Sequence, residues 1–279
     1  AQRRNLLWAA LLVLVVSMLL TLVWLAGRFE VEKLQLQTDR DASDAVSDLR
    51  NGLTRNLRAL ETIIPIGMTS AQWSAQAERL LRDRREWLRI EWRDSQLKLL
   101  AGANNPSRPP LLTLLGPDHL LPEINLACTQ ARRAGTASYS PSNYIVSDQG
   151  AGVEVVELCL PWSLDGEIRG YLIASYSLSD VLTGMVSTNL YRSQQVSFVE
   201  PDGTRLAMVG QIREGKRSFN SQQMLSLPGA SLMVRIDSRR MGPATVRSRT
   251  SELPIATTSA IAAICAGVKP SCVFWPLTK

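Results

Sequence analysis

The chain has 279 residues, a formal net charge of +6 and a sequence pI of about 9.4. Its basic residues are scattered, and the densest group, in 79–93, is interspersed with acidic residues. Such mixed charge is typical of a solvated helix face and not of a surface that binds phosphates, so we expect no nucleic-acid partner.

The first predicted element is the apolar segment Leu6–Gly27, which is interrupted only by Ser17 and Thr21. As a helix it covers the roughly 30 Å of hydrocarbon in a bilayer. It is longer than the apolar part of a signal peptide, about 7–15 residues, and WLAGR is a poor cleavage site. We therefore predict an uncleaved, single-pass transmembrane helix. Arg3 and Arg4 favour a cytoplasmic N-terminus, residues 1–5, with the body in the periplasm.

Residues 28–64 predict one long juxtamembrane helix, because apolar residues recur there every three or four positions without an intervening proline. We call these positions the juxtamembrane stripe: Ala42, Val46, Leu49, Leu53, Leu57, Leu60 and Ile64. The stripe either packs on its own domain or pairs with its twin in a homodimer, and different turns can serve each purpose. In the second case, charged substitutions at Leu49 and Leu53 should weaken the dimer.

Residues 65–190 predict a membrane-distal sheet module. A helix is expected over 69–84, a hairpin over 87–101, a loop over 103–110 and a helix over 122–134. Strands then follow over 144–147, 152–162 and 168–177, the last two joined by the turn signal Asp165-Gly166. A single helix over 178–191 leads out of the module.

Residues 191–240 predict a smaller, membrane-proximal sheet module. Its hairpin, 195–207, weakly repeats the pattern of the first hairpin around the turn 201–203, and one further strand is expected within 225–237. Residues 241–279 change in character, with basic residues followed by an Ala/Thr/Ile-rich stretch that is too short to span a membrane. We expect this region to be an irregular tail, out of frame with the receptor sequence.

Catalysis and metal binding find no support in the residue patterns. The chain contains one histidine, His119, and it has no nucleophile elbow, phosphate-binding loop or His/Cys cluster. We expect no enzymatic activity, no metal and no cofactor. Among the four cysteines, Cys128 and Cys159 lie in apolar contexts, where buried thiols are expected, and a disulfide between them is the alternative.

The order of these elements resembles that of a known class of receptors. The segments that carry this resemblance are LRIEWRD (88–94), LPW (160–162) with Asp165-Gly166, GYLIASYSL (170–178) and PDGTRLA (201–207). Together they resemble the extracytoplasmic sensor region of bacterial Cache (PAS-like) receptors, in particular transmembrane sensor histidine kinases of the tandem, dicarboxylate-sensing type. The resemblance covers residues 2–237 and implies an α+β fold, with a transmembrane helix that continues into a long helix packed on antiparallel sheets in two modules.

The same resemblance implies a ligand pocket between the first sheet and the loops that cover it. The polar residues that we expect around it are Arg89, Arg93, Tyr139, Tyr144, Tyr171 and Ser175. An arginine there would pair bidentately with a carboxylate, so an organic acid is the expected ligand. The alternatives are a solvated strand face for the two arginines and core or dimer packing for the tyrosines. His119 is expected in a surface loop.

The expected function is that of a ligand-sensing module of a two-component sensor histidine kinase. Such receptors continue into a second transmembrane helix and a kinase, neither of which this sequence shows, so the resemblance implies a receptor truncated before its second span. The alternatives are the sensor part of a chemoreceptor or diguanylate cyclase, or an anchored scaffold protein of the cell envelope.

Overall fold

The computed structural model of the protein describes residues 2–107, 120–146, 152–211 and 217–240. The tail 241–279 and His119, on which the sequence raised expectations, lie outside these residues. The helices are α1 (Gln2–Glu61), α2 (Ser70–Asp83), α4 (Leu121–Ala134), α5 (Leu178–Met185) and α6 (Thr188–Ser193). The strands are β1 (Trp87–Asp94), β2 (Leu99–Asn104), β3 (Ser138–Tyr139), β4 (Asn143–Val146), β5 (Gly152–Leu164), β6 (Glu167–Ser177), β7 (Gln195–Val199), β8 (Arg205–Val209), β9 (Arg217–Leu227) and β10 (Ala230–Arg240).

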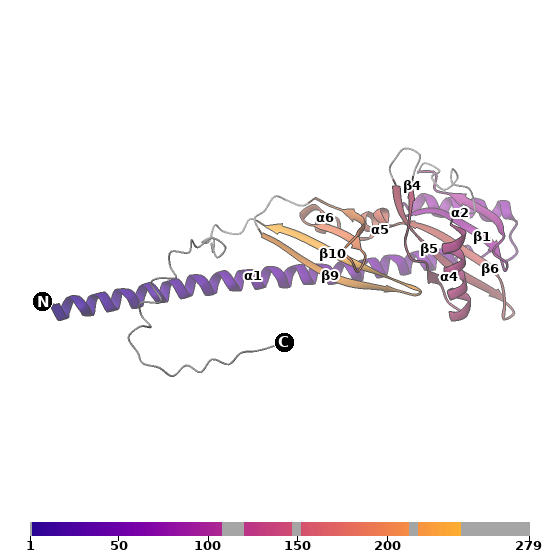
Figure 1. Ribbon diagram of the computed structural model, residues 1–279. Coiled ribbons are helices and arrows are strands. Elements are labelled where there is room, and N and C mark those ends of the chain that lie inside the picture. Colours follow the sequence, from indigo (N-terminus) through magenta and orange to yellow (C-terminus); the bar gives the residue numbers. More distant parts are fainter. Residues whose placement is uncertain (1, 108–119, 147–151, 212–216, 241–279) are drawn as a thin grey trace, which may run out of the picture. The chain divides into compact units, whose positions relative to one another are not determined.

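The strands form two antiparallel sheets (Figure 1). The first has the order β2-β1-β6-β5-β3, with β4 also paired to β5, and the second has the order β8-β7-β10-β9. A long apolar N-terminal helix followed by two antiparallel sheets is the α+β architecture expected from the sequence, and the predicted fold class is therefore confirmed.

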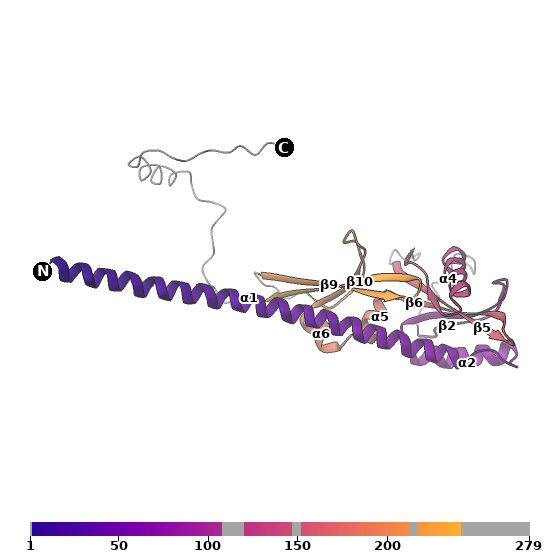
Figure 2. The same ribbon diagram turned by 90° about the horizontal axis from the view of Figure 1, so that it is seen from below.

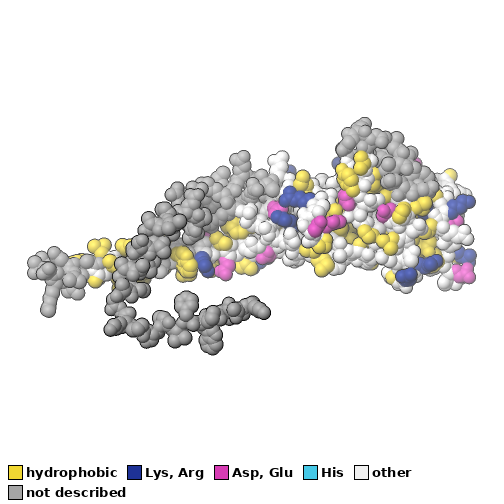
Figure 3. Space-filling model, in the orientation of Figure 1, with side chains coloured by type: hydrophobic (Ala, Val, Ile, Leu, Met, Phe, Trp, Pro, Cys, Tyr) yellow, Lys and Arg dark blue, Asp and Glu magenta, His cyan; other side chains and the backbone are white. Residues whose placement is uncertain are grey.

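The N-terminal part of α1 has the length and composition of a membrane-spanning helix. Its most apolar 18-residue window has a mean hydropathy of 2.6, and none of that window is buried in the protein. Hydrophobic side chains are exposed along this part of the helix (Figure 3). Without a bilayer, this surface would lie in water at a large free-energy cost, since each Å² of apolar surface contributes about 25 cal/mol.

Further along, α1 packs against both sheets of its own chain. Leu49 and Leu60 of the juxtamembrane stripe, from here on the α1 stripe, are fully buried, and the stripe belongs to one core cluster with residues of both sheets. Polar contacts reinforce this packing, since Gln35 Nε2 donates to the Asn220 carbonyl at 3.0 Å and Gln194 Nε2 donates to Asp41 Oδ2 at 2.5 Å. The stripe is therefore internal core, and the expectation that Leu49 and Leu53 serve a dimer contact is wrong.

Two leucines of α1 give a direct test of this packing. Leu49→Ala should lower the free energy of unfolding by about 3 kcal/mol, because it leaves a cavity in the shared core cluster. Leu36→Ala removes the same atoms from a side chain that is 56% exposed, so its effect should stay within about 0.5 kcal/mol. Chemical denaturation of the two variants measures the difference, and equal losses would contradict the assignment of the stripe to the core.

Local sequence signals explain where several elements begin and end. Thr69 caps α2, with Gln72 completing the capping box, and Gly135 ends α4 in the left-handed conformation. The expected helix over 178–191 is instead two helices, because Val186 adopts an extended backbone and α6 begins only after Ser187.

The second sheet contains a strand that the sequence analysis missed. β9 pairs with β10 along its whole length, whereas its first half, RSFNSQQ, is polar enough to be taken for a loop. Only its inner side chains, such as Phe219 and Leu225, are buried. The two-residue β3 was missed as well, and β2 continues to Asn104, where a loop was expected.

Candidate functional site

The two faces of the first sheet differ in what covers them. Helices α1 and α2 lie on one face, and α4 lies on the other (Figure 2). Beneath α4, its buried residues Ile124, Ala127 and Cys128 form a separate small core with Tyr171 and Ile173 of β6. We call this side of the sheet the α4 face.

Strand register brings four of the six predicted site residues to the α4 face. Arg89 lies opposite Ser175 and Arg93 lies opposite Tyr171, while Ser175 also lies opposite Glu157 of β5. Residues directly opposite in an antiparallel pair point to the same face. Arg89, Ser175 and Glu157 therefore form one line across three strands, which we call the polar row.

The two arginines are neither solvated nor free for a ligand. Arg93 is 2% exposed and Glu91, between the two arginines on the same face of β1, is 4% exposed. Arg93 Nε donates to Glu91 Oε2 at 2.6 Å, and Arg89 Nε lies 2.7 Å from Glu91 Oε1 in an ion pair. The one carboxylate thus uses both of its oxygens on the two guanidinium groups, and the expected pairing of an arginine with a ligand carboxylate is not supported.

Glu157 is a buried carboxyl group whose hydrogen bonds this arrangement leaves incomplete. Its residue is 1% exposed, Ser175 Oγ donates to its Oε2 at 2.8 Å, and its Oε1 has no hydrogen-bond partner among the described residues. The pKa of Glu157 is raised to about 8, mainly by burial; the hydrogen bond from Ser175 and the charge of Arg89 lower it, and the nearby charge of Glu91 raises it. Buried polar atoms without a partner are uncommon in folded proteins, and each calls for an explanation.

A second carboxyl group approaches the polar row from α4. Glu123, in the first turn of that helix, has its own buried oxygen, Oε2, without a hydrogen-bond partner among the described residues, and its charge also raises the pKa of Glu157. Around the polar row, three carboxyl groups (Glu91, Glu123 and Glu157) thus meet two guanidinium groups (Arg89 and Arg93). Since Glu91 already occupies both guanidinium groups, the two free oxygens belong to Glu123 and Glu157, and both are hydrogen-bond acceptors when ionised.

The other two predicted site residues lie on the opposite face. Tyr139 pairs with Leu158, and its ring packs against Tyr176 at a centroid distance of 6.2 Å, in the core beneath α1. Tyr144 pairs with Glu154 and is 57% exposed. The register of β3 and β4 on β5 thus separates both tyrosines from the α4 face, and the sequence does not show that register.

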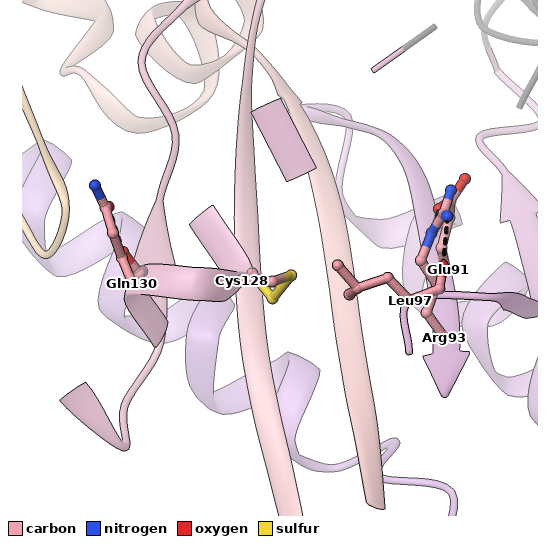
Figure 4. The surroundings of a disulfide bond; sticks show 7 residues. Glu91, Arg93, Leu97, Cys128 and Gln130 are labelled. Carbon is pink, nitrogen blue, oxygen red and sulfur yellow. Dashed lines mark hydrogen bonds and ion pairs between the residues drawn. A yellow bond between two sulfur atoms is a disulfide. The ribbon is translucent and has the colours of Figure 1, made fainter. Parts of the chain in front are cut away.

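A disulfide joins α4 to the sheet. Cys128 and Cys159 are bonded, with their Cα atoms 5.2 Å apart, where two buried thiols were expected. Cys159 lies opposite Ile173 on the α4 face, directly beneath the helix that carries Cys128. Figure 4 shows the side chain of Leu97, from the turn between β1 and β2, pointing toward this disulfide, with the Arg93–Glu91 pair nearby. The bond fixes the position of α4 over the sheet.

No protein-family model matches the sequence, and no curated protein shows significant similarity to it. Solved structures do match. The ligand-binding domain of the Pseudomonas fluorescens chemoreceptor CtaA in complex with L-serine has a TM-score of 0.52 and 13% identity, and the match covers 75% of this chain and 98% of that one. The ligand-binding domain of the Pseudomonas aeruginosa PAO1 amino acid chemoreceptor PctB in complex with L-Arg has a TM-score of 0.50 and 14% identity, with 75% and 96% covered. The chain therefore has the fold of chemoreceptor ligand-binding domains, in keeping with the Cache-like fold that the sequence resembles.

Proposed function

We propose that this chain is a membrane-anchored, extracytoplasmic sensor that binds a small molecule on the α4 face of its first sheet. The observation that carries the proposal is the buried and unpartnered carboxyl oxygen of Glu157, placed on a fold that chemoreceptors use for ligand binding. A ligand that completes the hydrogen bonds of Glu157 would favour the arrangement of the sheet that it binds best, and the population of states would shift accordingly.

The chemistry of the free atoms points to a ligand that bears an ammonium group. The unpartnered oxygens of Glu157 and Glu123 are acceptors when the carboxyl groups are ionised, and the three carboxyl groups around the polar row outnumber the guanidinium groups of Arg89 and Arg93 by one. An ammonium group supplies three N–H donors and a compensating charge. The solved neighbours were crystallised with L-serine and L-Arg, both of which carry such a group. By the same argument, a dicarboxylate ligand is disfavoured.

The proposal also includes the membrane anchor and the signalling module that would receive the signal. Leu6–Gly27 would hold the sensor in the bacterial inner membrane, with the body in the periplasm and no catalytic role in this chain. The signal would pass along α1 to an output module, either the histidine kinase that the sequence resemblance implies or a chemoreceptor module. A homodimer through α1 also belongs to the proposal, but it must use the helix surface away from the α1 stripe, where Leu36 is exposed.

A thermal-shift panel on the full chain in lipid nanodiscs tests this function. The panel contains L-serine, L-arginine, putrescine and succinate. At a concentration of 100 times the Kd, a ligand stabilises the folded state by about 2.7 kcal/mol, so at least one of the ammonium-bearing compounds should raise Tm clearly.

Each other outcome of the panel would change the proposal. A shift with succinate alone would retain the sensor and overturn the ammonium assignment. No shift with any compound, together with capture of a stable protein partner, would favour the anchored scaffold instead.

A further inference from the structure

A cleft on the α4 face lies outside the polar row. It has a volume of about 200 Å³ and opens between the β1–β2 turn and the C-terminal half of α4. The residues that line it are Ser95, Gln96, Leu97, Cys128, Thr129, Arg132 and Tyr171. None of the polar row lines it, so its chemistry can be considered separately.

The polar side chains of the cleft can all donate hydrogen bonds, and the one charge among them is positive. Ser95, Gln96, Thr129 and Tyr171 each carry an N–H or O–H group, and Arg132 adds a guanidinium group. No carboxylate is among these lining residues, and Arg132 has no ion pair within the described part of the chain. The nearest acidic residue on the turn, Asp94, directs Oδ1 to the backbone N–H groups of Gln96 and Lys98.

The inner wall of the cleft is apolar. It is formed by Leu97, the largely buried Tyr171 and Cys128 of the disulfide. Leu97 adopts a left-handed backbone with φ of 65°, which costs free energy for a residue with a branched side chain. Arg93 Nη1 donates to the Leu97 carbonyl at 2.8 Å and holds the turn in this form. The chain therefore keeps a strained turn that places an apolar side chain against the disulfide at this cleft (Figure 4).

We propose that this cleft is a second binding site, which takes a small carboxylate with an apolar body. The carboxylate would pair with Arg132 and the neighbouring donors, and the apolar body would lie against Leu97, Tyr171 and the disulfide. This inference does not depend on the proposed function of the polar row, because the two sites share no residue and have opposite charge.

Fluorine NMR of 4-fluorobenzoate with the full chain in nanodiscs at pH 7.5 tests the proposal, with empty nanodiscs as the blank. The probe signal should broaden in the presence of the protein, whereas the neutral analogue 4-fluorobenzyl alcohol should not respond. Arg132→Gln should weaken binding about tenfold or more, because a charge-assisted pair is lost. Arg133→Gln is the matched control, since Arg133 is the next residue of the same helix turn and does not line the cleft.

Three results would overturn the second site: no broadening with the wild-type protein, binding that survives Arg132→Gln, or equal losses in the two arginine variants. Glu157→Gln separates this site from the polar row. The variant should broaden the 4-fluorobenzoate line as the wild-type protein does. If the broadening is lost in this variant, the two sites are one.

Discussion

Glu91→Gln is expected to lower the free energy of unfolding by about 3–5 kcal/mol, since it removes the carboxylate that the buried guanidinium groups of Arg89 and Arg93 both contact. Arg93 is 2% exposed and the Arg89 side chain is 13% exposed, so water cannot replace the lost carboxylate. The glutamine keeps the shape of the side chain, which restricts the change to charge and hydrogen bonding. Urea unfolding of the full chain, followed by circular dichroism, measures the effect.

Glu167→Gln is the control for this substitution. Its ion pair with Arg169 joins side chains that are 73% and 48% exposed, and pairs of this kind contribute about 0–1 kcal/mol. Similar losses of stability in the two variants would show that the Arg89–Glu91–Arg93 group is solvated, as the sequence alone allowed.

The pH dependence of stability gives the second large effect, and it comes from Glu157. Folding raises the pKa of this carboxyl from 4.5 to about 8, so the folded state binds the proton more tightly than the unfolded state. The contribution of the protonated Glu157 carboxyl to the free energy of unfolding is fully present below pH 4.5. It is lost as the pH rises to about 8, at up to about 1.4 kcal/mol per pH unit.

Glu157→Gln should abolish this contribution. The variant cannot ionise at this position, so the difference in unfolding free energy between variant and wild type should grow in favour of the variant from pH 5 to pH 8. Thermal or urea unfolding across this range measures the difference. A constant difference for Glu157→Gln over this range would mean that the carboxyl is already ionised in the folded protein at pH 5.

The period of the apolar residues was enough to predict most elements of the fold. The alternation in β1 and the three- to four-residue steps of the α1 stripe each mark one buried face, and both were assigned to the right type of element. Elements with few apolar residues were harder to predict. β9 is the clearest example, since its polar first half is held in the sheet by its register with β10.

The candidate site was only partly predictable, because it depends on which strands become neighbours. Arg89, Arg93, Tyr171 and Ser175 were found on one face, but the sequence could not show that β3 and β4 place their tyrosines on the other. Glu91 was missed although a signal existed: it stands between the two arginines at the same period of two.

Glu157 and the disulfide required the tertiary structure. Glu157 can be recognised as a site residue only once the structure shows Ser175 beside it and α4 above it. Cys128 and Cys159 are 31 residues apart in the sequence, and their pairing follows from the packing of α4 over β5.

Titration calorimetry with the panel compound that gives the largest thermal shift tests the central claim most directly. We predict that Glu157→Gln weakens its binding about tenfold or more, because the charge-assisted contact to the ammonium group is lost. Glu154→Gln, on the opposite face of the same strand, should bind as the wild type does. Wild-type affinity should rise from pH 6 to pH 8, as Glu157 ionises. Unchanged binding in Glu157→Gln, or an affinity that falls over this pH range, would contradict recognition of an ammonium group by Glu157.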